Sequence, residues 1–481
     1  MSVASAVLAA ASLGAQPSAR PTAPIVADSG TPLAFDAFYA RVQRFHPVVQ
    51  QARLLAAQAD AELRVAYGSF DPQLSVFWDK KSFNGIGYYD ETEFKATVPT
   101  PFGMDVKLGY DRAAGQIINP ERATPSTGLY QLGVAIPIGQ RIVTDERRNA
   151  VRQAKALKDV ADGDRRGVVN RLLLDATKDF GRWYEAARRR AIAREGVQLA
   201  SFRLSAVRER VRQGDAPAID TIEASLEVQR REVTRLDTEQ AEYVARLAVS
   251  AYLWDDRGDP VDPSPDAVPS LLGLDLAARV DSTALPRWLA MAEERHPELV
   301  KINGRVRQAE AQRLFVGQQL LPAASVEVST LTSGDRRNRI IAFDNSSENY
   351  KTTALFKSSL LLLKERGRFD QAGQRLASQK FEAARLRREI ALDVRSATNA
   401  LSALVEQLRG QAIAVEQSRL LLAGELRRFE NGESSLLIVN LRERALLDER
   451  VRLAGLEAKY AAARTELAVA VGEPSLLAVV R

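Results

Sequence analysis

The chain has 481 residues, of which 46% are hydrophobic and only 6% aromatic, a balance that favours long helices over compact globular modules. Cysteine is absent, which excludes disulfides, thiolate chemistry and soft-metal sites. Its only two histidines, His46 and His296, lie 250 residues apart, so histidine-based metal or acid/base chemistry has little material. The sequence predicts no metal and no cofactor.

The distribution of charge and the absence of catalytic motifs argue against nucleic-acid-binding proteins and enzymes. The 67 basic and 61 acidic residues are mixed along the whole chain, as on solvated helix faces, and do not form the basic stripe of a nucleic-acid-binding protein. There is also no phosphate loop, nucleophile elbow, paired-histidine motif or dinucleotide fingerprint, so no catalysis is expected. No run reaches the roughly 18 apolar residues of a spanning helix. A membrane role would therefore have to use strands.

The amino-terminal segment suggests export. Residues 3–13 form a short alanine-rich apolar run, and a stretch rich in proline, serine and alanine follows as far as Pro24. This pattern resembles a secretory signal peptide, although no lysine or arginine precedes the apolar run. Residues 1–24 are accordingly expected to be a signal peptide and flexible amino terminus.

An internal repeat organises the rest of the chain. The chain contains two copies of one plan, and residues of the first copy match identical residues 250 positions later, without a gap, as far as Pro72 and Val76. From Tyr130 onward the matching residues are only about 220 positions apart. The first copy is therefore longer between the matched prolines and the matched tyrosines, and a longer loop would account for the difference. The matched pairs are His46-Pro47 with His296-Pro297, Pro72 with Pro322, Val76 with Val326, Tyr130 with Tyr350, and Gly214 with Gly432.

Each copy begins with a helix and a strand region. Proline after histidine suits the first helical position, so helices are predicted from these pairs to about residues 67 and 318. Strand regions follow at about 70–137 and 322–360, where apolar and polar residues alternate. Residues 82–127 and 332–349 are rich in glycine, asparagine, serine and proline and are expected to be loops, with room for a short hairpin over 94–110.

A long helical hairpin completes each copy. Residues 140–213 and 364–431 contain no proline, and about 70 helical residues extend roughly 100 Å. Each helix should stop at a glycine, Gly214 or Gly432, before a second helix returns over 217–254 or 436–471. The predicted seam of the second hairpin is a coiled-coil stripe: Leu401, Leu404, Leu408, Ala412, Val415, Leu422, Leu426 and Phe429.

The predicted domains are repeat 1 over 33–254, a proline-rich linker over 255–285, repeat 2 over 286–472 and a tail over 473–481. Two strands per copy leave sheet edges exposed, and four strands per chain are too few for a membrane barrel, which needs at least eight. Closure would require several chains. The alternative is a soluble coiled-coil scaffold, which leaves the alternating strands unexplained.

This order of duplicated elements resembles the outer-membrane efflux protein family, the TolC-like channels. The resemblance implies a mainly α fold with a small β part, in which a homotrimer forms a 12-strand β-barrel in outer-membrane lipid and a long periplasmic α-barrel. It implies a passive export duct of a tripartite efflux or type I secretion system. Its partners would be a periplasmic adaptor (membrane fusion) protein and an inner-membrane pump of the RND, ABC or MFS class, without nucleic acid.

The resemblance also implies roles for the hairpin turns. Residues at the two tips would surround the periplasmic mouth and contact the adaptor: Gly214, Asp215, Gly432, Glu433 and Ser434. Some family members place gate acids six and nine residues after the second glycine. Those positions hold Ile438 and Leu441 here, whereas the equivalent positions of the first copy hold Asp220 and Glu223. These acids are candidate gate residues or, alternatively, ordinary first-turn acids favoured by the helix dipole.

Other candidates have plainer interpretations. His46 and His296 precede prolines at helix starts, so capping is favoured over ligation. The aromatic residues Trp78, Tyr88, Tyr89 and Tyr130 are either an interfacial belt or strand packing. The residues Phe180, Trp183 and Tyr184 are interpreted as helix packing.

Overall fold

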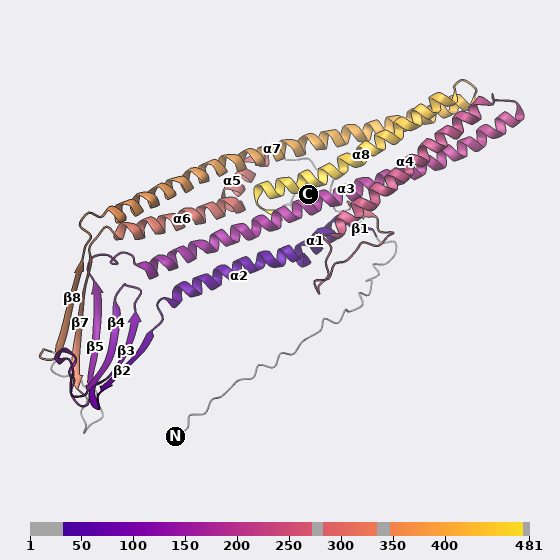
Figure 1. Cartoon of the computed structure of the whole chain (residues 1–481). Coiled ribbons are helices and arrows are strands. Elements are labelled where there is room, and N and C mark those ends of the chain that lie inside the picture. Colours follow the sequence, from indigo (N-terminus) through magenta and orange to yellow (C-terminus); the bar gives the residue numbers. More distant parts are fainter. Residues whose placement is uncertain (1–31, 272–281, 334–346, 475–481) are drawn as a thin grey trace.

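The computed structural model describes residues 32–271, 282–333 and 347–474, so the expected signal peptide lies outside the described residues. The molecule is elongated, with a sheet at one end and two long helical hairpins reaching to the other (Figure 1). Among the described residues, no helix has the length and apolar character needed to cross a membrane.

Each repeat begins with a pair of helices joined at a histidine. In the first copy α1 (Phe35–Phe45) leads into α2 (Pro47–Gly68), and in the second α5 (Leu285–Arg295) leads into α6 (Pro297–Gln318). His46 Nδ1 accepts a hydrogen bond from the Val48 N–H at 3.2 Å, and His296 Nδ1 accepts one from Glu298 at 3.3 Å. Both histidines are therefore helix caps, which confirms the plainer interpretation.

The sheet has six strands and not the four that the repeat predicted. In spatial order they are β2 (Gln73–Phe83), β3 (Ile86–Pro99), β4 (Asp105–Ala114), β5 (Leu129–Pro137), β7 (Ala323–Ser333) and β8 (Tyr350–Lys357), each antiparallel to its neighbours. Strands β3 and β4 occupy the stretch that was expected to be mainly loop. Asn84 and Gly85 both have positive φ, the two-residue turn that matches strand twist in a hairpin.

The strand-entry prolines lie where they were predicted, since Pro72 and Pro322 directly precede β2 and β7. A small second sheet pairs β1 (Leu33–Ala34) with β6 (Pro269–Ser270) of the linker in parallel. Two short 3₁₀ helices, η1 (Pro120–Arg122) and η2 (Ser282–Ala284), complete the connections.

Two helices of 68 residues run the length of the molecule, α3 (Glu146–Gln213) and α7 (Leu363–Glu430), and the shorter α4 (Ile219–Ser250) and α8 (Leu436–Val471) return beside them. Helix α3 begins later than predicted because the preceding residues still pair with the second repeat: the Gln140 N–H donates to Pro322 O at 2.8 Å. The Asp145 carboxylate then caps the helix by accepting from the Arg148 N–H at 2.8 Å.

The helices form a layer, four across. Next to the sheet the order is α2, α3, α6, α7, and towards the tips it is α4, α3, α8, α7 (Figure 1). The copies meet at α3, where a Cβ on Gly163 would lie 2.6 Å from Pro297 O, so only glycine permits this approach. Phe180 and Trp183 are fully buried against α1, which confirms their packing role.

Candidate functional site: helical tips, charged cluster and sheet faces

The two helical tips form one packed unit. Gly214 and Gly432 adopt left-handed backbones, with φ of 83° and 76°, which explains why glycine ends both helices. Leu436, at the start of α8, packs with Val207 and Ala224 of the first hairpin. The Arg210 guanidinium lies 5.2 Å from the centroid of the Phe429 ring. The predicted tip residues Asp215, Glu433 and Ser434 lie in these two adjacent turns.

The candidate gate acids lie on the first turns of α4, and both are half-buried. The Asp220 N–H donates to Pro217 O at 3.1 Å, so its backbone completes the turn. Glu223 lies near α8: the pKa of the Arg444 guanidinium is raised mainly by its hydrogen bond to Glu227, with a smaller contribution from Glu223. Glu223 therefore acts on a cation of the second hairpin.

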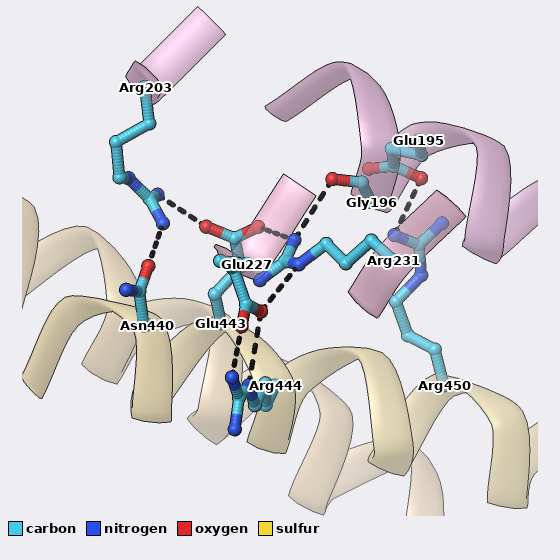
Figure 2. Close-up of polar contacts among 9 residues, drawn as sticks. All are labelled: Glu195, Gly196, Arg203, Glu227, Arg231, Asn440, Glu443, Arg444 and Arg450. Atoms are coloured by element: carbon cyan, nitrogen blue, oxygen red, sulfur yellow. Dashed lines mark hydrogen bonds and ion pairs between the residues drawn. The ribbon is translucent and has the colours of Figure 1, made fainter. Parts of the chain in front are cut away.

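A buried group of charges, which sequence reasoning missed, joins the two hairpins behind the tips (Figure 2). This charged cluster consists of Arg203 on α3, Glu227 and Arg231 on α4, and Asn440, Glu443 and Arg444 on α8.

Its contacts run between the helices of both repeats. The Glu443 carboxylate pairs with Arg203 and Arg231. Arg203 also donates to Asn440 Oδ1 at 2.6 Å, and Arg444 Nε donates to Glu227 Oε1 at 3.1 Å. The two return helices, one from each repeat, are thus tied to each other and to α3.

Burial makes these ion pairs strong constraints. Glu443 is 1% exposed, Glu227 4% and Arg231 8%. Removing one partner from a buried pair leaves an uncompensated charge and typically costs about 3–5 kcal/mol. For Glu227, burial opposes ionisation, but hydrogen bonds from Arg444 and Arg231 outweigh it and hold its pKa below the ordinary value. Glu227 is therefore ionised at neutral pH.

A cavity of about 480 Å³ opens beside the cluster between α3, α4 and α8. Four arginines line it against two acids, so its wall carries net positive charge. The lining charges are Arg189, Arg230, Arg231, Arg444, Glu227 and Asp448.

The sequence contained a signal for this cluster. The buried stripe of α4 includes Ala224, Glu227 and Arg231, which step by three and four as seam residues do. Charges at seam positions require buried partners, but those partners lie more than 200 residues away on α8. Spacing alone could not identify them.

The strand register divides the sheet into two unlike faces. One row crosses four strands, because Val76 lies opposite Phe94, Phe94 opposite Tyr110, and Tyr110 opposite Tyr130. The half of this face that lies nearer the helices is largely apolar. The apolar members of the whole face include Leu74, Val76, Trp78, Phe94, Ala96, Val98, Val106, Leu108, Tyr110, Tyr130, Leu132, Val134, Ile136, Val326, Val328, Tyr350, Ala354 and Phe356.

The opposite face is charged. Lys107 Nζ lies 2.5 Å from Glu327 Oε2, across β5, and Tyr89 donates to Asp79 Oδ2 at 3.2 Å. Of the candidate belt residues, Trp78 and Tyr130 therefore lie on the apolar face and Tyr89 on the charged one. Alternation of this kind suits strands with lipid on one side and water on the other.

Comparison with known proteins finds a similar family and similar folds. The family model described as outer membrane efflux protein matches residues 288–473, which is most of the second repeat. No curated protein matches the sequence.

Solved structures of outer-membrane channels share the fold over 91% of this chain. The Campylobacter jejuni channel CmeC is 12% identical, with 85% of its own chain covered and a TM-score of 0.61. The outer-membrane channel OprN is 15% identical, with 89% of its chain covered and a TM-score of 0.63. VceC from Vibrio cholerae is 13% identical, with 96% of its chain covered and a TM-score of 0.60.

The fold is that of the TolC-like outer-membrane channels. The chain's second repeat is similar to the outer membrane efflux protein family.

Proposed function

We propose that three copies of this chain close into one continuous duct, the outer-membrane component of a tripartite efflux or type I secretion system. One observation carries this proposal: each layer of the molecule ends in unpaired elements on the same two sides. The sheet ends in β2 and β8. The helical layer ends in α2 or α4 on the first side and in α7 on the second.

These edges have the chemistry of surfaces that another copy covers. On α4, Ile222 is 65% exposed and Val233 59%, and on α7, Phe381 is 77% exposed and Ile413 58%. Exposed apolar side chains along a whole helix favour a protein partner. Since β2 and β8 run in opposite directions, β8 of one copy can pair with β2 of the next in the antiparallel pattern of the rest of the sheet.

The scaffold alternative is disfavoured by the sheet. A soluble interaction protein has no use for a largely apolar face spread over six strands, with charged pairs such as Lys107 and Glu327 on the other side. Lipid outside and water inside account for both faces.

At the other end, the adaptor would dock on the tips, at Gly214, Asp215, Gly432, Glu433 and Ser434, and a pump of the RND, ABC or MFS class would supply energy. The charged cluster bears on how the tips open. Because it ties α4 to α8 through buried ion pairs, the two hairpins of one copy would move together, and opening would separate neighbouring copies.

Asp220 and Glu223 would then form the electrostatic part of the gate. Repeated three times around a narrow mouth, their carboxylates would attract cations. Asp220→Asn is expected to lower the cation selectivity of single channels, whereas Asp256→Asn, in the exposed linker, should leave it unchanged. Unchanged selectivity in Asp220→Asn would contradict the gating role.

The trimer and its partners are tested together by mild crosslinking of cell envelopes, followed by purification and mass determination. The expected product is three copies of the chain after signal-peptide removal, with an adaptor and pump attached. A matched variant, Phe381→Glu, places a charge on the α7 edge and should weaken the trimer while leaving the helical content of each chain intact. A soluble monomer would rule out the proposal.

A further inference from the structure

The six-stranded sheet contains a hairpin with no counterpart in the repeat. At an offset of 250, β2 falls on β7 from its first residue to its last. At an offset of 220, β5 falls on β8 to within one residue. The hairpin of β3 and β4 therefore stands between two strands that, in the second copy, pair directly with each other.

This inserted hairpin is paired on both sides. Strand β3 pairs with β2 from Gln73 to Phe83, and β4 pairs with β5 from Asp105 to Asp111. Its backbone groups thus fill the ladder that would otherwise join β2 to β5. A hairpin lying outside the sheet would leave β2 and β5 to pair with each other, as β7 and β8 do in the second copy.

The hairpin also shares the two faces of the sheet. Phe94, Ala96 and Val98 of β3 and Val106 and Leu108 of β4 continue the apolar face. Their neighbours on the other face are charged, as in the ion pairs of Lys95 with Glu93 and of Lys107 with Glu327. An extramembrane loop would have no reason to keep this division in register with the flanking strands.

The widths of the sheet and of the helical layer also indicate that the inserted hairpin belongs to the barrel. Strands lie about 4.8 Å apart and tilt by about 35–45° in membrane barrels, so six strands span about 35–41 Å of circumference. Four helices packed about 8–10 Å apart span about 32–40 Å. Each copy therefore contributes nearly equal arcs to sheet and helical layer, whereas four strands at the same tilt would span only about 23–27 Å.

We infer that the outer-membrane end of this duct is a barrel of eighteen strands, six from each of three copies, and not the twelve that the family resemblance implied. This inference rests on the proposed trimer. Barrels of 16–18 strands enclose an aqueous channel. The barrel would thus continue the helical tunnel at similar width, and the restriction on cargo size would lie at the periplasmic tips.

Paired cysteines distinguish the two barrels, because the natural chain has no cysteine. Val76→Cys with Phe94→Cys joins β2 to β3 and should form an internal disulfide in the membrane-embedded trimer. Val76→Cys with Val134→Cys is the matched control. The equivalent residues of the second copy, Val326 and Ala354, lie opposite each other, so this control pair meets only if the hairpin is excluded from the barrel.

Oxidation in isolated outer membranes, followed by maleimide labelling of the remaining thiols, gives the readout. Protection of the first pair with full labelling of the second supports the inference, and the reverse overturns it. Electron cryomicroscopy of the trimer in lipid provides an independent strand count: eighteen is expected, and a trimer with twelve strands would refute this inference alone. A monomer would refute the proposed trimer as well.

Discussion

Glu227 and Arg231 lie one turn apart on α4, and Arg231 Nε is 2.8 Å from Glu227 Oε1 although both side chains are more than nine-tenths buried. Each also reaches α8: Glu227 pairs with Arg444, and Arg231 with Glu443. A local pair on one helix is thus extended into a connection between the two repeats. Such pairs constrain geometry because their separation would expose opposite charges to an apolar interior.

Glu443→Ala is expected to destabilise the folded chain by about 3–5 kcal/mol, because it leaves the guanidinium groups of Arg203 and Arg231 without their shared carboxylate. Thermal unfolding of the purified protein, followed by circular dichroism, measures the change. Glu406→Ala is the control, since the Glu406 side chain is 73% exposed and pairs only along its own helix with Arg409. Equal midpoints for the two variants would show that the cluster does not hold the hairpins together.

Acid should weaken the ion-pair connection between α4 and α8 that includes Glu227. Because the pKa of Glu227 is lowered in the folded chain from the ordinary value of 4.5, the folded state binds the proton less readily than the unfolded state. Its stabilisation is fully present above pH 4.5 and is lost as the pH falls below that value through the lowered pKa. Thermal midpoints measured between pH 7 and pH 3 should fall less steeply for Glu227→Gln than for the natural chain. Parallel curves would remove Glu227 as the titrating group.

The histidine caps predict a second effect, at milder acidity. Burial lowers the pKa of both His46 and His296, and each Nδ1 can accept its backbone hydrogen bond only while unprotonated. The unfolded chain takes up protons near pH 6.5 and the folded chain does not, so stability should decline as the pH falls from 6.5 through the lowered pKa values. Asparagine caps helices without titrating in this range. The double variant His46→Asn, His296→Asn should therefore lack this part of the decline, and an unchanged profile would contradict the assignment.

The helical half of the molecule could be predicted from sequence because its determinants are local. Histidine followed by proline starts α2 and α6, and the glycines that end α3 and α7 need left-handed backbones. The span expected for the second return helix, 436–471, agrees with α8. Caps, stops and periodicity act within a few residues, so one sequence contains them in full.

The extra hairpin and the charged cluster depend on partners far along the chain. Strands β3 and β4 are rich in polar residues because one of their faces is charged, and such a composition alone predicts a loop. The Asn84-Gly85 turn is a hairpin signal, but only the ladder to β5 shows that the hairpin joins the sheet. Likewise Glu443 resembles an ordinary helix-surface acid until α3 and α4 are placed against it.

The two faces of the sheet give a test of membrane insertion that uses adjacent residues. Leu132 lies on the apolar face of β5, between Leu108 and Thr330, and its neighbour Gln131 points to the charged face. An arginine facing lipid near the bilayer midplane costs about 2–4 kcal/mol, whereas one facing water costs little. Leu132→Arg should therefore reduce the amount of protein in the outer-membrane fraction, while Gln131→Arg should assemble normally and shift ion selectivity towards anions. Because both variants add the same charge to the same strand, equal losses would show that the apolar face does not contact lipid.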